Sequence, residues 1–174
     1  QGDAGDDSLT GGEGNDWMSG GNGNDTMGGG AGNDTMLGGA DDDCIDGGVG
    51  NDTISGGTGS DSIFGGAGAD SMAGNAGTDI LMGGEGNDTM SGGTDNDTLH
   101  GGEGDDLIEG GTGDDLLVGD NNNSQEPVLL ENGNYEVSAT NGLSISIDSI
   151  SHTAGYNNSL GIYFADSNGN PISG

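Results

Sequence analysis

An aspartate recurs at every ninth residue through most of this chain, without an insertion or a deletion. The thirteen members of the series are Asp7, Asp16, Asp25, Asp34, Asp43, Asp52, Asp61, Asp70, Asp79, Asp88, Asp97, Asp106 and Asp115. Carboxylate oxygens are the ligands that hard cations such as Ca²⁺ take from proteins. A regular series of carboxylates therefore predicts a repeated cation site, and the thirteen aspartates are its candidate metal ligands.

The chain contains no basic side chain that would neutralise these carboxylates. It has 31 Asp and Glu, no Lys or Arg, and a formal net charge of −31 at pH 7. Such a charge excludes nucleic acids and anionic membranes as partners. No apolar run approaches the roughly 20 residues that a membrane-spanning helix requires, so we expect no membrane insertion.

The composition also leaves little apolar surface for a core. Only 28% of the 174 residues are hydrophobic, while 43 are glycine. A chain of low hydrophobicity and high net charge is usually disordered, because burial cannot offset the conformational entropy lost on folding. The single Cys44 permits no internal disulfide, and the chain has no Cys/His cluster for zinc or iron–sulfur. We therefore expect a cation bound by oxygen to supply the missing folding energy.

The aspartates belong to a nine-residue repeat that runs through residues 2–118 in thirteen copies. When positions are numbered from Gly2, position one is glycine in every copy, and position two departs from glycine only at Asp3 and Asn75. Position six is the aspartate. Position eight is always aliphatic or methionine, namely Leu9, Met18, Met27, Met36, Ile45, Ile54, Ile63, Met72, Leu81, Met90, Leu99, Ile108 and Leu117.

This spacing predicts a turn followed by a short strand. Glycines at positions one, two and four allow the positive-φ conformations of tight turns, so we expect the first six residues of each copy to form a turn. The last three residues then form a strand whose middle side chain faces inward. Two copies complete one coil, so copy n stacks on copy n+2. About six and a half coils, at about 4.8 Å each, give a roll roughly 31 Å long.

Stacking places the aspartates of copies n and n+2 next to each other. Bare carboxylates about 5 Å apart repel strongly in a low dielectric, and a divalent cation between them would convert that repulsion into ligation. Thirteen copies contain eleven such pairs. We therefore expect up to about eleven Ca²⁺ ions, and folding that depends on them.

Two copies depart from glycine at position four, at Asp41 and Asp95. Aspartate tolerates left-handed backbone geometry better than most residues. We therefore favour a conservative backbone role for these two residues over a role as additional ligands.

The pattern Gly-Gly-x-Gly-x-Asp-x-U-x, where U is apolar, resembles the RTX (repeats-in-toxin) nonapeptide, a calcium-binding repeat. The resemblance covers residues 2–118 and implies an all-β fold, a right-handed parallel β-roll. It also implies that backbone carbonyls of the glycine-rich turns complete the coordination of each Ca²⁺ beside the aspartates. Finally, it implies a protein that type I secretion machinery exports unfolded and that folds outside the cell, at about millimolar calcium.

A different pattern follows the repeats. Residues 119–127 are polar and predict a linker, while residues 128–174 predict the start of a β-rich C-terminal domain that is truncated. Apolar residues alternate with serine at 143–147, as in an antiparallel strand, so we expect a partial antiparallel β segment after the roll. The stretch at 154–161 is similar to sequences that follow RTX tracts in large bacterial adhesins exported by type I secretion.

These features indicate a structural calcium-binding module rather than an enzyme. His100 and His152 lie in no metalloprotease motif and beside no serine nucleophile elbow, so we expect no catalysis by this chain. We favour a segment of a secreted bacterial adhesin, outside the cell and either free or attached to its surface. The alternative is the accessory module of a secreted hydrolase or toxin whose catalytic domain is absent from this chain. An ice-binding face is disfavoured, because Ala4, Asn22, Ala40 and Ala76 interrupt the threonines at position three of the odd-numbered copies.

Overall fold

The computed structural model describes residues 1–119, 135–139 and 143–147. None of these residues forms a helix of the length and hydropathy needed to cross a membrane. The predicted linker, apart from Gly119, and most of the predicted C-terminal domain lie outside the described residues. The division of the chain into these domains therefore stays a prediction.

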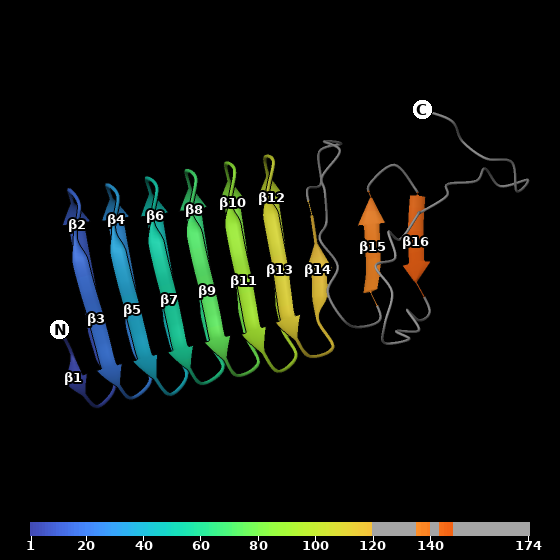
Figure 1. Ribbon diagram of the computed structural model, residues 1–174. Coiled ribbons are helices and arrows are strands. Elements are labelled where there is room, and N and C mark those ends of the chain that lie inside the picture. Colours follow the sequence, from blue (N-terminus) through green and yellow to red (C-terminus); the bar gives the residue numbers. More distant parts are fainter. Residues whose placement is uncertain (120–134, 140–142, 148–174) are drawn as a thin grey trace, which may run out of the picture.

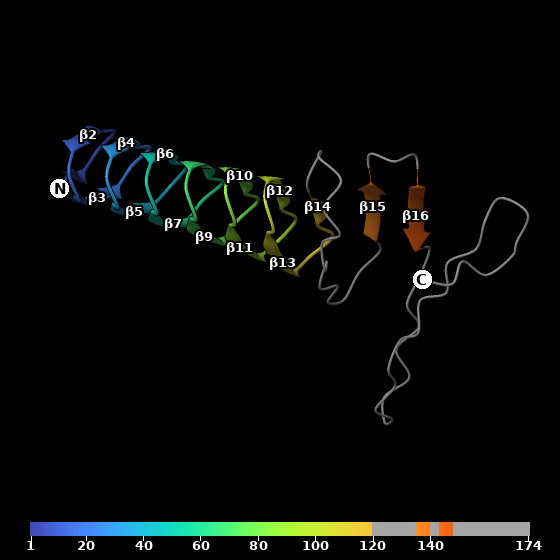
Figure 2. The ribbon, with the colours of Figure 1, turned by 90° about the horizontal axis from the view of Figure 1, so that it is seen from above.

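Two seven-stranded parallel sheets form the walls of a roll (Figure 1, Figure 2). The first sheet contains β1 (Asp3–Ala4), β3 (Trp17–Asn22), β5 (Thr35–Ala40), β7 (Thr53–Thr58), β9 (Ser71–Ala76), β11 (Thr89–Thr94) and β13 (Leu107–Thr112). The second contains β2 (Ser8–Glu13), β4 (Thr26–Ala31), β6 (Cys44–Val49), β8 (Ser62–Ala67), β10 (Ile80–Glu85), β12 (Thr98–Glu103) and β14 (Leu116–Val118). The chain crosses from one wall to the other after every strand.

Each strand pairs with the strand two further along the chain. In the second sheet, Met27 of β4 lies opposite Ile45 of β6, which lies opposite Ile63 of β8. The same repeat position therefore recurs on neighbouring strands, because two nonapeptides complete one coil. The predicted stacking of copy n on copy n+2 and the all-β parallel solenoid are confirmed.

The strands are longer than the spacing alone predicted. Most contain six residues, from position seven of one copy to position three of the next, as in Cys44–Val49. Gly48, at position two, has a φ of 102° yet still pairs in register with Gly66 of the next coil. The prediction that positions one to six form a turn is therefore wrong for positions one to three. The adjacent coils offer them backbone partners, which leaves only positions four to six for the turn.

The left-handed geometry expected at the two unusual position-four residues is confirmed. Asp41 and Asp95 both have a φ of 76°, in the region that glycine occupies at this position in other copies. The two exceptions at position two behave in the same way, with φ values of 74° for Asp3 and 81° for Asn75. Asp and Asn are the residues that most readily replace glycine in this region.

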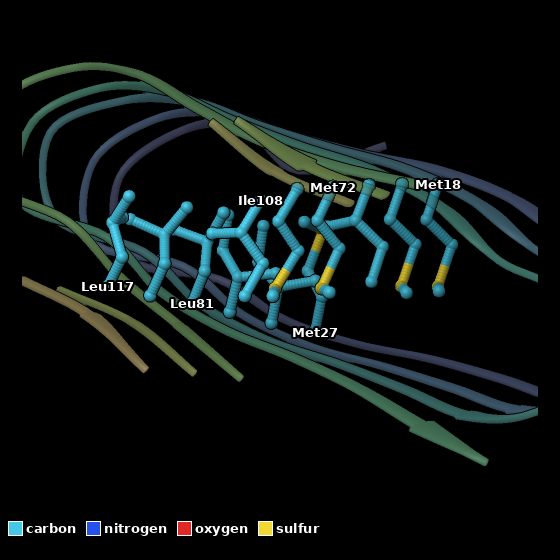
Figure 3. Close-up of a cluster of buried hydrophobic side chains, with 12 residues drawn as sticks. Met18, Met27, Met72, Leu81, Ile108 and Leu117 are labelled. Atoms are coloured by element: carbon cyan, nitrogen blue, oxygen red, sulfur yellow. The ribbon is translucent and has the colours of Figure 1, made fainter. Parts of the chain in front are cut away.

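The apolar core is a single column of position-eight side chains between the two sheets (Figure 3). Side chains from Met18 to Leu117 are all buried, and Ile45 and Ile63 have no exposed surface. Leu9, in the first coil, packs against this column but is only partly buried. One apolar side chain per nonapeptide makes a thin core. The other inward position of each strand is position one, which is always glycine.

An antiparallel pair follows the roll. Strand β15 (Tyr135–Ala139) pairs with β16 (Leu143–Ile147), and β15 contacts β14 at the end of the roll (Figure 1). The strand expected from the alternation at 143–147 is therefore present.

Candidate metal-binding columns

The thirteen position-six aspartates stack in two columns, because successive turns alternate between the two sides of the roll. One column contains Asp7, Asp25, Asp43, Asp61, Asp79, Asp97 and Asp115, and the other contains Asp16, Asp34, Asp52, Asp70, Asp88 and Asp106. All are buried except Asp7 and Asp16, which belong to the first coil and are partly exposed. The structure thus brings the predicted site residues together as the repeat spacing required.

In eleven of the thirteen aspartates, all except Asp7 and Asp16 of the first coil, one carboxylate oxygen, Oδ1, accepts a backbone N–H of the preceding coil. The backbone N–H of Asp43 donates to Oδ1 of Asp61 at 2.8 Å, and that of Asp61 donates to Oδ1 of Asp79 at 2.8 Å. The same bond repeats in both columns, as between Asp34 and Asp52 at 2.7 Å. A buried carboxylate that accepts a backbone N–H is partly compensated for its lost solvation. These bonds also fix the orientation of the carboxylates that accept them.

The second oxygen, Oδ2, has no such compensation. In all thirteen aspartates Oδ2 is buried and has no hydrogen-bond partner. Buried polar atoms are almost always satisfied, and an unpaired charged oxygen is especially costly. A whole series of orphaned oxygens, all in equivalent places, indicates that these oxygens belong to a repeated binding site.

Beside ten of the thirteen position-one glycines, an orphaned Oδ2 and a backbone carbonyl oxygen of the next coil both border the space that a Cβ would fill. A Cβ added to Gly11 would lie 2.6 Å from Oδ2 of Asp16 and 2.6 Å from the carbonyl oxygen of Gly29 in the next coil. A side chain at Gly11 would therefore collide with both oxygens. Position one is glycine in every copy because an orphaned Oδ2 always borders the space that a Cβ would fill.

Burial raises the pKa of seven of the column aspartates, since a charged carboxylate loses solvation. The pKa rises from 3.8 to about 6 for Asp43, Asp61, Asp88 and Asp97. Three more are raised by the same main cause: Asp52, Asp70 and Asp79. The backbone N–H that binds Oδ1 opposes this rise, and neighbouring charges add to it, as Asp61 does for Asp43. Without a cation, these seven carboxylates therefore bind a proton more readily than a solvated aspartate does.

A hard cation is the group that fits this arrangement of oxygens. Each turn offers a carboxylate oxygen without a donor, and most offer a carbonyl oxygen beside the same glycine. These are the ligand types that Ca²⁺ takes. Within the described residues, no three His, Cys, Asp or Glu side chains converge as they would in a metal site built from side chains alone. Cys44 is an exposed free thiol.

A second ladder of side chains was not foreseen from the sequence. At position five, the backbone N–H of Asn33 donates to Oδ1 of Asn15 at 2.9 Å, and the N–H of Asn51 donates to Oδ1 of Asn33 at 3.0 Å. These bonds run in the direction opposite to those of position six, so a turn that makes both bonds is held from both neighbours. The signal was present in the sequence, because position five is Asn or Asp in all copies except those with Ser60, Ala69 and Thr78.

The fold and the columns together define a class of protein: a parallel β-solenoid with a repeated acidic turn on each side. The family model of the RTX calcium-binding nonapeptide repeat matches this chain in four copies, at residues 1–27, 29–54, 55–90 and 91–125. The chain belongs to this family, and residues 1–125 constitute a calcium-binding structural module of the RTX type. Comparison with curated proteins gives no match.

Proposed function

We propose that the thirteen position-six aspartates ligate calcium through Oδ2, with up to about eleven ions in the two columns. The supporting observation is that every Oδ2 is buried without a donor, in a chain that has no Lys or Arg. Carbonyl oxygens such as that of Gly29 are the additional ligands that this geometry favours. Calcium then supplies positive charge where the chain has none.

In this proposal calcium also drives folding. The apolar column contains one side chain per nonapeptide, which is too little to offset the entropy of ordering nine residues. The roll adds the cost of burying a carboxylate in every nonapeptide. Ion binding to the folded state alone stabilises that state by linkage, and many sites multiply the effect.

Counting the bound ions tests this proposal. We expect isothermal titration calorimetry to give about eleven Ca²⁺ per chain, with heat and β-structure appearing together. Magnesium is a useful control, because it requires near-octahedral geometry and dehydrates reluctantly, so it should not replace calcium in the columns. A calcium stoichiometry near zero or one would contradict the proposal.

The calcium dependence of folding suits a protein that is secreted before it folds. RTX repeat proteins are typically secreted by type I systems, and a chain that stays unfolded at low calcium suits export as an extended polypeptide. The module would then fold outside the cell, at about millimolar calcium, as a non-enzymatic segment of a secreted adhesin. The sequence similarity at 154–161 supports the adhesin over a hydrolase or toxin.

The neighbouring reading frame distinguishes these parents. Repeated β-domains upstream of Gln1 would support the adhesin, whereas a catalytic motif there would assign the roll to a secreted enzyme as its accessory module. Expression with and without type I secretion machinery tests the route: we expect export only when the machinery is present.

A further inference from the structure

The position-five ladder is interrupted in the middle of the roll. Its bonds join every pair of adjacent turns through the first eight copies. The last two run from the N–H of Ser60 to Asp42 at 2.7 Å, and from the N–H of Ala69 to the side chain of Asn51 at 3.0 Å. The ladder resumes only at Asn87, whose Oδ1 accepts a backbone N–H of the following coil at 3.0 Å. The interruption falls at three consecutive copies in which position five is neither Asn nor Asp.

Three consecutive ladder bonds are absent from the described part of the roll. They would join Ser60 to Thr78, Ala69 to Asn87, and Thr78 to Asn96, since turns 18 residues apart are adjacent. Successive turns lie on alternate sides of the roll, so the gap affects both sides at the same level. The ninth copy, which contains Thr78, therefore has a position-five bond to neither neighbouring coil.

The ninth copy is attached more closely to the coil before it than to the coil after it. The side-chain amide of Asn75 donates to the hydroxyl of Ser55 in the preceding coil at 3.0 Å. Toward the following coil, the N–H of Gly77 donates to the carbonyl of Thr94 at 3.3 Å, compared with 2.9 Å for the corresponding bond one coil earlier. The weakest level of the roll therefore lies on the C-terminal side of the ninth copy.

We call this level the seam: it separates the turns up to 77–79 from the turns that begin at 86–88. Strand β9 still pairs with β11 across it. The position-six bonds also cross it, from the N–H of Asp70 to Oδ1 of Asp88 at 2.9 Å on one side of the roll. On the other side, the N–H of Asp79 donates to Oδ1 of its neighbour at 2.8 Å. The aspartate columns are thus the side-chain ladder that joins the turns across the seam.

We propose that the position-five side chains are positioning residues for the calcium turns, and that their absence at the seam divides the roll into two calcium-folding units, residues 2–79 and 86–118. This inference rests on the proposed calcium function of the columns. Each coil of a solenoid contacts only its neighbours, so a weaker interface lets the parts on either side fold separately. As free calcium falls, the shorter C-terminal unit loses its structure while the N-terminal unit keeps its own.

The columns also predict how many ions leave with the C-terminal unit. Of the adjacent aspartate pairs, Asp70–Asp88 and Asp79–Asp97 cross the seam, and Asp88–Asp106 and Asp97–Asp115 lie beyond it. An ion shared by any of these pairs loses a ligand when the C-terminal unit unfolds. We therefore expect about four ions to be released before the others.

Hydrogen exchange measured by mass spectrometry over a series of free-calcium buffers tests the division, because it reports each unit separately. The double variant Ala69→Asn/Thr78→Asn supplies the two missing acceptors across the seam. The matched control, Ala31→Asn/Thr58→Asn, makes the same two replacements at exposed position-three sites outside the ladder. The rate of calcium release to a chromophoric chelator is the second readout, and calorimetry gives the total ion count.

We expect the parent to lose exchange protection in two steps, first in residues 86–118, and to release about four ions in a faster phase. The double variant at the seam should give one step and one phase. An exposed hydrogen bond shifts a folding equilibrium by about threefold, so two bonds shared among about four ions lower the calcium midpoint of the C-terminal unit by about twofold. The control should behave as the parent does, and the total ion count should be the same in all three.

The reciprocal variant, Asn15→Ala/Asn24→Thr, copies the residues of the seam into an intact part of the ladder. It removes the acceptors of the bonds from the N–H groups of Asn33 and Asp42. We expect a new early step confined to residues 2–25. A single step in the parent, two steps in the filled variant, equal merging in the control, or no new step in the reciprocal variant would each overturn the inference. A parent that binds its full complement of calcium in one step would reject only the seam, whereas a parent that binds no calcium would reject the proposed function itself.

Discussion

The two kinds of buried column in this roll differ in how far the protein alone satisfies them. The position-eight column is apolar and tightly enclosed, and its members need only one another (Figure 3). The aspartate columns are buried to a similar degree, yet one oxygen of every carboxylate has no partner. The chain by itself satisfies the apolar part of this interior, whereas each buried carboxylate keeps one oxygen without a hydrogen-bond partner. In our proposal, calcium is the partner of that oxygen.

The largest expected effect comes from removing calcium. With the aspartate columns unsatisfied, the apolar column is too thin to hold the roll, so we expect circular dichroism to change from β-structure to coil on addition of a chelator. Excess calcium should restore the β spectrum. If the β spectrum persists in full after complete chelation, the apolar column is sufficient to fold the roll and the aspartate columns need no cation.

One substitution in an aspartate column and one in the apolar column should separate the roles of the two kinds of column. Asp61→Ala removes a carboxylate shared with Asp43 and Asp79, so calorimetry should show up to two fewer ions. At calcium 100-fold above Kd this costs about 5 kcal/mol of unfolding free energy. Ile63→Ala is the matched change in the apolar column, where it should cost about 2–5 kcal/mol and leave the ion count unchanged. An unchanged stoichiometry in Asp61→Ala would show that position six is no ligand.

The dependence on pH should change sign with calcium. Without calcium, the folded pKa of Asp43, Asp61, Asp88 and Asp97 is about 6, above the ordinary 3.8. The folded state then binds more protons than the unfolded state, so its stability is greatest below about pH 4 and is lost as the pH rises through about 6. With calcium present, protons compete for the same oxygens, and acid should raise the calcium midpoint.

Circular dichroism of the calcium-free protein, compared at about pH 4.5 and pH 7.5, measures the first arm, and calcium titrations at the same two pH values measure the second. We expect acid to stabilise the calcium-free roll and to weaken calcium-induced folding. If acid instead stabilises the roll both without and with calcium, the same oxygens do not bind protons and calcium in competition.

The smallest expected effect is a chemical one on the apolar column. Met18, Met27, Met36, Met72 and Met90 are 5% exposed or less, whereas Met82 lies on the outer face at 43%. Peroxide oxidises accessible thioethers to sulfoxides. With calcium, we expect peptide mass spectrometry to find oxidation mainly at Met82, and without calcium at all six. Equal oxidation of the column with and without calcium would mean that the aspartate columns do not control the packing of the core.

Much of this architecture could be predicted from residue types and their spacing. The inward column followed from one apolar residue at position eight, and the stacking of copies two apart followed from the repeat. The left-handed φ of Asp41 followed from its place in a glycine position. The strand length was missed, because Gly48 has the local preferences of a turn but pairs with Gly66 of the next coil. The ligand role of the aspartates and their ion count stay predictions.

The sequence by itself determined the period, the inward apolar position and the two acidic columns, since each depends on residue types repeated at a constant spacing. Only the tertiary structure decided which oxygen of each carboxylate is bound and which is left over. It also decided the opposite directions of the position-five and position-six ladders and the lengths of the backbone hydrogen bonds beside Asp41 and Asp95, which are 3.1 Å from Gly23 to Ala40 and 3.3 Å from Gly77 to Thr94. Each of these features depends on contacts with the adjacent coil, 18 residues away, which no property of neighbouring residues along the chain can specify.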